Sequence, residues 1–336
     1  MSSQPAHRRA TAAQPPDAGA PGRVVARFGQ RYIVALDTPP EPLPGGPAPT
    51  LAEGNASNAE VDAIGRGRHQ DIVVGDRVHC SREPDLHVIE TIEPRRNLLF
   101  RADTTRTKPL AANVDQVAIV FAAQPPSQPE FLWRALLAAR AAGIDALAIL
   151  NKIDLEGPAA QMAEAALEEV ARLGARTLRL SARKDPATAR PLLEAQCRGR
   201  VTLFVGQSGM GKSSLLNLLI DSNLRTGALS RGGTHGRQTT TATRWFSYGS
   251  DGAVIDSPGF HEFGLEHLDS QHLTQWLPDF AAVNAPCRFA DCRHAEEPDC
   301  RIREALAAGA ISAERYAFYR KLLAQEPGAT VSKVWR

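Results

Sequence analysis

The sequence predicts a multidomain α/β protein: a small β-barrel or sandwich first, a parallel α/β domain next and a metal-binding segment last. Three observations predict this order. Short β-like runs separated by glycine, proline and aspartate occupy residues 22–100. Strands then alternate with helical segments, which is typical of a parallel sheet covered on both faces. Finally, cysteine and histidine gather between Cys287 and Cys300.

Composition excludes several classes of protein. The chain has 336 residues, of which 43% are hydrophobic. Its net charge of +2 does not by itself indicate a nucleic-acid partner. It has no run approaching the roughly 18 apolar residues that a membrane span needs, so we expect no membrane partner. The Ala/Pro-rich residues 1–21 are expected to form a disordered leader on a cytoplasmic protein.

The first domain is expected over residues 22–100. Its β-like runs are interrupted by a Pro/Gly/Ala-rich insertion, residues 38–60, which we expect to be a long flexible loop. The runs are Gly22–Phe28, Tyr32–Leu36, Asp71–Val78 and His87–Ile89.

The second domain is expected over residues 101–268. It contains two expected helices, Pro129–Ala142 and Pro158–Leu173, each opened by a proline. The buried strands expected around them are Val117–Phe121, Ala146–Leu150, Thr177–Leu180, Val201–Val205 and Ala253–Ile255.

A phosphate-binding loop is expected directly after the strand that ends at Val205. The segment fits G-x-x-x-x-G-K-[ST], and a chance glycine-rich turn is the alternative, which the flanking strand and helix argue against. Backbone N–H groups would converge on phosphate oxygens, Lys212 would reach the β- and γ-phosphates, and the Ser213 hydroxyl would ligate Mg²⁺. The nucleotide-binding residues expected here are Gly206, Gln207, Ser208, Gly209, Met210, Gly211, Lys212, Ser213 and Ser214.

A guanine-reading loop is expected upstream, where Asn151, Lys152, Ile153 and Asp154 form N-K-x-D after a strand. The Asp154 carboxylate can accept from N1–H and the 2-amino group of guanine, whereas adenine would leave it unpaired. Asn151 would brace the loop, and the Lys152 stem would lie along the base. The backbone of Ser181-Ala182 could meet the guanine O6, although a plain loop is an equal alternative there.

Residues that sense the γ-phosphate are expected in two segments. Asp256 would hold Mg²⁺ through water and the Gly259 N–H would bond the γ-phosphate, with a simple Asp/Pro/Gly turn as the alternative. In the glycine-rich segment before it, Thr239 or Thr240 would ligate Mg²⁺, and the sequence does not choose between them. Phe260 stands where many GTPases place a water-orienting glutamine, so slow intrinsic turnover is expected.

A third domain, residues 269–336, is expected to bind zinc. Cys287, Cys292, His294 and Cys300 give C-x4-C-x-H-x5-C, which suits one tetrahedral, structural Zn²⁺. A redox or reactive-thiol role is the alternative. Cys80 and Cys197 are interpreted as plain buried residues, and Ser312–Gln325 as a helix.

The order of these motifs carries a resemblance. N-K-x-D and Ser-Ala precede the phosphate loop, the Thr-Thr pair and the Asp256–Gly259 segment, whereas Ras-like proteins begin with the phosphate loop. With the β-domain in front and the cysteine cluster behind, the chain resembles the RsgA (YjeQ/EngC) family of circularly permuted GTPases. Gly65–Arg68 and Val74–Val78 also resemble that family's first domain.

The resemblance implies an OB-fold barrel, a circularly permuted P-loop GTPase domain and a C-terminal zinc-binding helical domain. It also implies a monomer that binds the small (30S) ribosomal subunit through 16S rRNA, acts late in its maturation and hydrolyses GTP to GDP and phosphate when bound. Family members usually have a histidine before the threonine pair, a candidate for positioning the attacking water. Here that residue is Gln238, which can also orient water, and His235 is a second candidate.

Two other functions fit some of these features. An RNA-binding assembly factor could use GTP as a switch only, with negligible catalysis. An ATP-dependent kinase or ATPase could use the same phosphate loop, but Asp154 argues against adenine.

Overall fold

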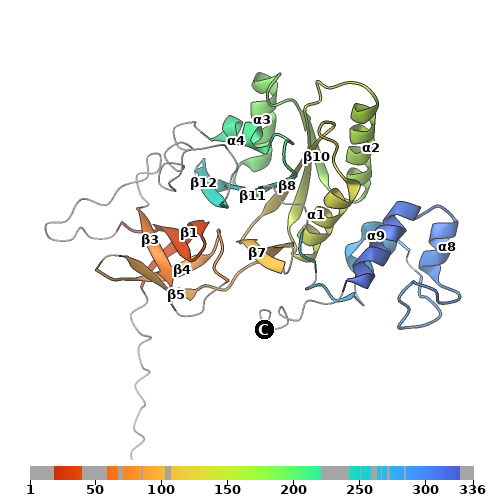
Figure 1. The fold of residues 1–336 in the computed structure, drawn as a ribbon, viewed down its shortest axis with the longest axis horizontal. Coiled ribbons are helices and arrows are strands. Elements are labelled where there is room, and N and C mark those ends of the chain that lie inside the picture. The colour runs from red at the N-terminus through yellow and green to blue at the C-terminus, as the bar shows by residue number, and fades with distance from the viewer. Residues whose placement is uncertain are drawn as a thin grey trace, which may run out of the picture.

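The structure is a computed structural model that describes residues 19–39, 59–66, 71–84, 86–102, 107–220, 242–249, 251–258, 263–265, 267–270, 273–283 and 285–325. Figure 1 shows a barrel at one end, an α/β domain in the middle and a small helical segment at the other end. Within those ranges, an eleven-stranded sheet runs from β10 (Arg176–Leu180) through the α/β domain into the barrel.

The barrel has five strands and an OB-fold arrangement. Its strand order is β1-β2-β3-β5-β4, and a second pairing of β1 with β4 closes the sheet on itself. Side chains of Val24, Tyr32, Val34 and Ile89 fill its core. The strands are β1 (Ala20–Phe28), β2 (Arg31–Leu36), β3 (Glu60–Gly65), β4 (Arg77–Arg82) and β5 (His87–Ile92).

The strand expected over Asp71–Val78 is wrong for Asp71–Asp76, and only Arg77 and Val78 belong to a strand, β4. In this segment only Val74 makes a bridge before β4 begins, because Gly75 (φ +96°) turns the chain and the Asp76 carboxylate accepts from the Val73 N–H at 2.8 Å. A Cβ on Gly75 would lie 2.1 Å from the Ala112 oxygen, so the turn packs closely against β7 (Thr107–Ala112). The apolar run therefore reflects burial rather than strand pairing.

Two other parts of the barrel were not expected from the sequence. The strand β3 follows the predicted 38–60 insertion, of which residues 40–58 lie outside the described residues. The strand β1 begins at Ala20, inside the predicted 1–21 leader, of which residues 1–18 lie outside the described part.

The α/β domain contains the strands and helices expected from the sequence, within one or two residues at each end. Its strand order is β10-β9-β8-β11-β13-β12, parallel except for β12. Figure 1 shows α1 and α2 on one face and α3 and α4 on the other. The elements are β8 (Gln116–Ala122), α1 (Pro129–Ala141), β9 (Asp145–Asn151), α2 (Pro158–Arg172), β10 (Arg176–Leu180), α3 (Pro186–Cys197), β11 (Val201–Val205), α4 (Lys212–Leu219), β12 (Arg244–Tyr248) and β13 (Gly252–Asp256).

Alternate residues of β8 explain how both faces are covered. Val117, Ile119 and Phe121 belong to the core beneath α1 and α2, while Ala118 and Val120 belong to the core beneath α3 and α4. The helix α3 was not identified from the sequence, because Pro186 and Pro191 are turn signals there.

The strand order reverses beside β8. The chain runs from β8 outward through β9 to β10, then returns to place β11 on the opposite side of β8. In open parallel sheets, ligands bind in the crevice that such a reversal leaves at the carboxyl ends of the strands. The loops after β8 and β11 should therefore border the functional site.

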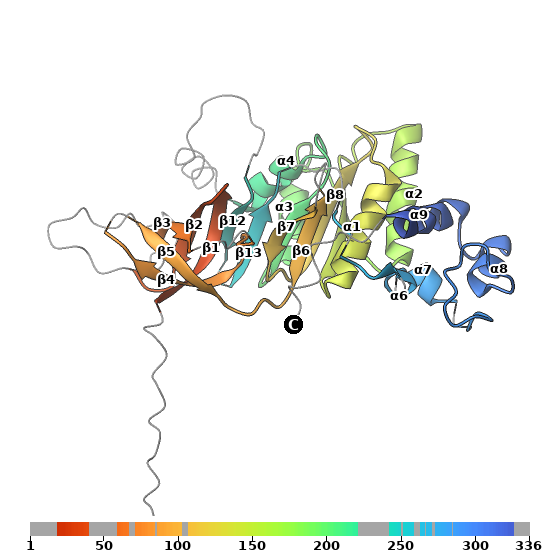
Figure 2. The same ribbon diagram turned by 60° about the horizontal axis from the view of Figure 1, so that its bottom comes forward.

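The barrel continues into the α/β sheet through β12. Ala26 of β1 pairs with Arg244 of β12, the Arg23 guanidinium lies 4.6 Å from the Trp245 ring centroid, and that of Arg244 lies 5.1 Å from the ring of Phe28. Figure 2 shows the strands of the two parts side by side. The connecting hairpin consists of β6 (Leu98–Ala102) and β7 (Thr107–Ala112).

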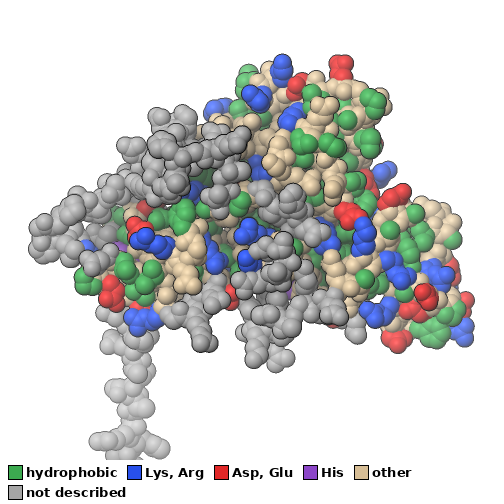
Figure 3. Space-filling model, in the orientation of Figure 1, with side chains coloured by type: hydrophobic (Ala, Val, Ile, Leu, Met, Phe, Trp, Pro, Cys, Tyr) green, Lys and Arg blue, Asp and Glu red, His purple; other side chains and the backbone are tan. Residues whose placement is uncertain are grey.

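The C-terminal segment packs on α1. Arg315 forms a bidentate ion pair with Asp279 at 2.7 and 2.8 Å, and its guanidinium lies 5.1 Å from the Trp133 ring centroid. Acidic and basic side chains alternate over this segment in Figure 3. The helices are α6 (Leu273–Trp276), α7 (Pro278–Ala281), α8 (Arg301–Ala307) and α9 (Ala313–Ala324), and α9 confirms the expected helix. None of the helices in the described ranges is long and apolar enough to span a bilayer.

Candidate functional site

The phosphate-loop segment connects β11 to α4. Its glycines sit at φ +155° (Gly206), +81° (Gly209) and +95° (Gly211), and Gly211 caps the helix in the left-handed region. A Cβ on Gly206 would lie 2.4 Å from the Val120 oxygen, and one on Gly211 would lie 2.2 Å from Asn151 Nδ2. The loop therefore lies tightly against the end of β8 and against Asn151, in front of the N-terminus of α4.

Lys212 points its ammonium group back into the loop. Its Nζ donates to the carbonyl oxygens of Gly206 and, at 3.1 Å, Gln207. Burial lowers the pKa of Lys212, and the nearby negative charge of Asp256 raises it in opposition. The Lys212 ammonium group is therefore partly desolvated, and this favours the binding of an anion beside it. Ser213 is exposed on the first turn of α4.

Asn151 joins three loops. It is 2% exposed, its Nδ2 donates to the Met210 oxygen at 3.0 Å, and its Oδ1 accepts from the Ala182 N–H at 3.1 Å. Lys152, at φ +62°, donates from Nζ to the oxygens of Gln124 (2.7 Å) and Gly209 (2.8 Å). The two residues fix the guanine-reading segment to the phosphate loop, although 59 positions separate Asn151 from Met210.

Asp154 is exposed beside these contacts and has a partner of its own. The Ser181 hydroxyl, buried at 6% exposure, donates to Asp154 Oδ1. The backbone contact of Ser181-Ala182 with guanine O6 stays a prediction, and in this structure the Ala182 N–H donates to Asn151 Oδ1. Ser181 therefore positions the carboxylate, while Ile153, 46% exposed, adds an open apolar surface.

Asp256 ends β13 next to β11 and is 4% exposed. It lies opposite Phe204 in the sheet, and the Ser257 hydroxyl donates to the Phe204 oxygen at 2.7 Å. This hydrogen bond fixes the chain as it leaves the strand, beside the phosphate loop. The predicted residues Gln238, Thr239, Thr240 and Gly259 lie outside the described residues, as do His235 and Phe260.

Sequence reasoning missed the contribution of the loop after β8. The Gln124 carbonyl accepts from Lys152, and the Gln128 N–H donates to Gln207 Oε1 at 3.5 Å. No motif marks these residues. The signal that could have found them is the strand order, because β8 and β11 are neighbours at the reversal.

The four predicted metal ligands form one cluster. One side-chain atom from each of Cys287, Cys292, His294 and Cys300 lies within 4.8 Å of the others. His294 Nδ1 is 3.5 Å from Cys287 Sγ and 3.4 Å from Cys300 Sγ, and these two sulfurs are 3.9 Å apart. Tetrahedral zinc with these ligand types separates its ligand atoms by about 3.5–3.8 Å, so the donor set fits a structural metal ion.

The helix α9 holds the backbone of this cluster. The Tyr316 hydroxyl donates to the His294 oxygen at 2.6 Å, and the Tyr319 hydroxyl donates to the Arg293 oxygen at 3.0 Å. Cys300, 2% exposed, occupies the N-cap position of α8. Cys80 and Cys197 are buried away from the cluster, as expected, and burial raises the pKa of their thiols to about 12 and about 11.

Comparisons with known proteins agree with this geometry. A family model described as RsgA GTPase matches residues 92–266. The chain is 42% identical over 306 residues to a Burkholderia pseudomallei (strain 668) protein named "Small ribosomal subunit biogenesis GTPase RsgA", covering 90% of this chain and 91% of the relative. A Paraburkholderia xenovorans protein of the same name is 41% identical over 320 residues, covering 92% and 94%.

Solved structures show the same architecture. YjeQ from Thermotoga maritima is 27% identical with a TM-score of 0.62, and the match covers 90% of this chain and 97% of that one. YloQ, described as a circularly permuted GTPase, is 24% identical with a TM-score of 0.60, covering 93% and 96%, and it supports the fold alone.

Proposed function

The chain belongs to the RsgA family of GTPases, and from this premise we propose that it hydrolyses GTP to GDP and phosphate while bound to the small (30S) ribosomal subunit. It acts late in the maturation of that subunit as a cytoplasmic monomer and contacts 16S rRNA. Its rate of GTP hydrolysis is higher when it is bound to the subunit. The name that its relatives share, small ribosomal subunit biogenesis GTPase, supports this proposal.

One observation carries the proposal: the predicted base-reading and phosphate-binding segments are joined by direct hydrogen bonds at the carboxyl end of the sheet. Asn151 contacts both Met210 of the phosphate loop and Ala182, and Lys152 contacts Gly209. A single guanine nucleotide can therefore place its base against Asp154 and its phosphates against Gly206–Ser213.

We propose a role in GTP binding and hydrolysis for each predicted site residue. Asp154 pairs with guanine N1–H and the 2-amino group, and Lys212 together with the loop amides stabilises charge that develops on the phosphates. Ser213 and Asp256 would hold Mg²⁺, which supplies further charge neutralisation when bound. Thr239 or Thr240 would complete that ligand set, and Gly259 would contact the γ-phosphate.

Gln238 is proposed to orient the attacking water, because Phe260 cannot do so. The Gln238→Ala variant should lose subunit-stimulated kcat and keep its affinity for GTP. Unchanged kcat at preserved affinity would remove this role from Gln238.

The metal cluster is proposed to hold one Zn²⁺ with a structural role, because it offers three thiolates and an imidazole in a closed set. We propose three domains at residues 22–100, 101–268 and 269–336, following the barrel, the α/β sheet and the cysteine cluster.

The decisive measurement is GTP hydrolysis by the purified protein alone, with small subunits and with large subunits. We expect slow turnover alone and stimulation by the small subunit. Stimulation by the large subunit alone, or equal use of ATP, would overturn the proposal. Binding to the small subunit with no stimulated turnover would instead favour the switch without catalysis, a function that Phe260 makes worth testing.

A further inference from the structure

The backbone of His294 has an unusual conformation for a metal ligand in a loop. Of the four predicted ligands, His294 is the one in the left-handed region, at φ +55°. Residues other than glycine rarely adopt this conformation, because it brings the Cβ close to the following carbonyl oxygen. It therefore needs contacts from other parts of the chain, and residues 293–297 have such contacts on two sides.

The Glu297 carboxylate holds the N–H groups of this loop. Its Oε1 accepts from the Arg293 N–H at 2.9 Å, and its Oε2 accepts from the N–H groups of Ala295 at 2.7 Å and Glu296 at 3.1 Å. Both oxygens thus bind the backbone, and Glu297 is not one of the four clustered metal ligands. Burial acts to raise the pKa of Glu297, but the hydrogen bonds from the backbone outweigh it and lower the pKa to about 2. The carboxylate is therefore charged at neutral pH, which strengthens its hydrogen bonds.

The helix α9 holds the carbonyl groups of the same loop. The Tyr319 hydroxyl donates to the Arg293 oxygen at 3.0 Å, and the Tyr316 hydroxyl donates to the His294 oxygen at 2.6 Å. One of the peptide groups beside the His294 Cα carries the Arg293 oxygen. The other carries the His294 oxygen and the Ala295 N–H, which donates to the carboxylate. Both peptide groups that set the backbone angles of His294 are therefore fixed by side chains.

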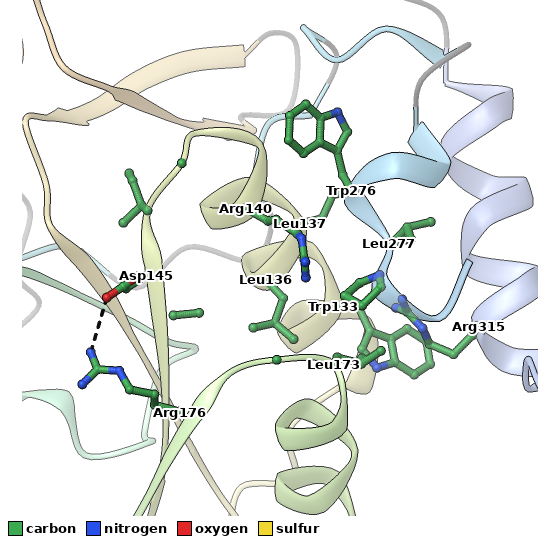
Figure 4. A pocket seen from close by; sticks show the side chains of 15 residues that line it. Trp133, Leu136, Leu137, Arg140, Asp145, Leu173, Arg176, Trp276, Leu277 and Arg315 are labelled. Carbon is green, nitrogen blue, oxygen red and sulfur yellow. Dashed lines mark ion pairs between the residues drawn. The ribbon is translucent and has the colours of Figure 1, made fainter. Parts of the chain in front are cut away.

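The helix α9 is itself anchored to the α/β domain. Figure 4 shows Arg315 of α9 beside Trp133 of α1, at the wall of a pocket between α1 and the α6–α7 segment. Asp279 holds the Arg315 guanidinium, and the Trp133 ring lies 5.5 Å from the ring of Phe318, which is also on α9. The two tyrosines therefore contact the loop from a fixed position, whereas Glu297 belongs to the loop that it organises.

We propose that Glu297 is a positioning residue of the metal site and that it acts through His294. By accepting the N–H groups on either side of His294, its carboxylate holds the left-handed turn. That turn places His294 Nδ1 3.5 Å from Cys287 Sγ and 3.4 Å from Cys300 Sγ. Residues that orient a metal ligand without touching the ion contribute to metal affinity. The proposal rests on the proposed structural Zn²⁺ site and adds to it a residue that cysteine and histidine spacing does not identify.

The test loads the purified full-length protein with Zn²⁺ or Co²⁺. Competition with a chelator gives the Zn²⁺ affinity, and Glu297→Ala should bind Zn²⁺ about tenfold to a hundredfold more weakly than the parent. The charge-transfer absorption of bound Co²⁺ reports its thiolate ligands, and its d-d absorption bands report the whole ligand set. In Glu297→Ala the thiolate absorption should remain. The d-d bands should shift toward those of His294→Ala, because water replaces an imidazole that is no longer held in place.

A double variant tests whether the two residues act together. If Glu297 acts through His294, adding Glu297→Ala to His294→Ala should cause no further loss of Zn²⁺ affinity, because the effects of coupled residues do not add. Glu296→Gln is the matched control. It removes the same charge one residue earlier, from an exposed side chain for which no hydrogen bond or ion pair is found in the described residues. Its affinity and its cobalt spectrum should match those of the parent.

Several results would overturn the proposal. If Glu297→Ala matches Glu296→Gln in affinity and in spectrum, the carboxylate does not position the ligand. If the thiolate absorption is lost together with the d-d bands, or if the effects of Glu297→Ala and His294→Ala add, Glu297 supports the whole segment rather than His294. A parent protein that binds neither ion stoichiometrically would remove the zinc site itself, and this proposal with it. If Glu297→Ala fails to fold, Glu297→Gln, which keeps the side-chain size and loses one acceptor oxygen, is judged by the same criteria with smaller expected changes.

Discussion

The guanine-nucleotide site and the metal cluster are assembled in opposite ways. The nucleotide site brings together segments between Gln124 and Asp256, tied by hydrogen bonds such as that from Asn151 to Met210. The metal cluster takes all its ligands from Cys287 to Cys300, within one loop. The fold of the α/β domain therefore builds the first site, whereas we expect the loop of the second site to need a bound metal ion in order to fold.

This difference determines what each site needs in order to persist. Around the nucleotide site, buried cores on both faces of the sheet hold the loops without a ligand. Around the metal cluster, Cys300 is buried while Cys287 and Cys292 are only half-buried, and much of the loop is exposed. Removing a ligand should therefore damage the second site far more than the first.

Loss of the metal ion should have the largest effect. Cys300→Ser removes a buried thiolate ligand, and structural zinc contributes about 10–16 kcal/mol of apparent binding free energy to small domains. We expect loss of bound metal and of hydrogen-exchange protection over residues 285–325, with GDP affinity nearly unchanged. Metal analysis, hydrogen exchange and GDP titration measure these three quantities.

Cys80→Ser serves as the control, since it alters an equally buried thiol outside the cluster. It should keep the metal ion. A large fall in GDP affinity in Cys300→Ser would show that the two sites are coupled, and the contrast between them would then be wrong.

Asn151→Ala should have the next largest effect, and at the nucleotide site. The substitution leaves the Met210 carbonyl and the Ala182 N–H without their partner, which costs about 1–3 kcal/mol for each buried group. We expect GDP affinity to fall about tenfold to a thousandfold and metal content to stay at one ion per chain.

Gln161→Ala is a suitable comparison for it, because Gln161 is exposed on α2 and its side chain makes no hydrogen bond found in the described residues. If Asn151→Ala binds GDP as Gln161→Ala does, the three loops are held together by something other than Asn151.

Asp154→Asn should change which base is bound rather than whether the site forms. An amide in place of the carboxylate loses the acceptor for one guanine donor but keeps an oxygen for the Ser181 hydroxyl. GTP affinity should fall by about 1–3 kcal/mol, and affinity for xanthosine triphosphate should rise. Competition binding with GTP, xanthosine triphosphate and ATP checks this, and unchanged preference for GTP would remove Asp154 from base reading.

Local patterns in the sequence predict both sites only up to a point. The cysteine spacing predicts the whole cluster, because its ligands are close in sequence. The phosphate loop and N-K-x-D are predicted for the same reason, each as a separate segment. Local sequence patterns do not contain the strand order. The contact of Lys152 with Gln124 was therefore not predicted.

The same reasoning explains the errors in the fold. The strands β8, β9, β11 and β13 are largely buried and were predicted within one or two residues, because continuous apolar runs mark them. The strand β12, which is only half-buried, was not predicted. The apolar run Ile72–Val74 gives a similar signal but lies in a turn fixed by Gly75 and by the Asp76 carboxylate. An apolar run in the sequence predicts burial. Only hydrogen-bonded pairing with a distant segment distinguishes a strand from a buried turn.

The smallest expected effect is a difference between the two sites in their response to pH. Burial lowers the pKa of Lys212, so in the free protein its charge is lost at a pH below the usual lysine value of about 10.4. Nucleotide affinity should therefore decline as pH rises through that lowered value, by at most about 1.4 kcal/mol per pH unit. The metal cluster should respond in the opposite direction, because its thiols must lose protons to bind and higher pH favours that. GDP affinity and metal retention measured from neutral to alkaline pH give both slopes, and Lys212→Arg, which stays charged, should flatten only the first. Parallel slopes at the two sites would mean that the alkaline change is a general loss of structure, with no separate titration at the phosphate loop.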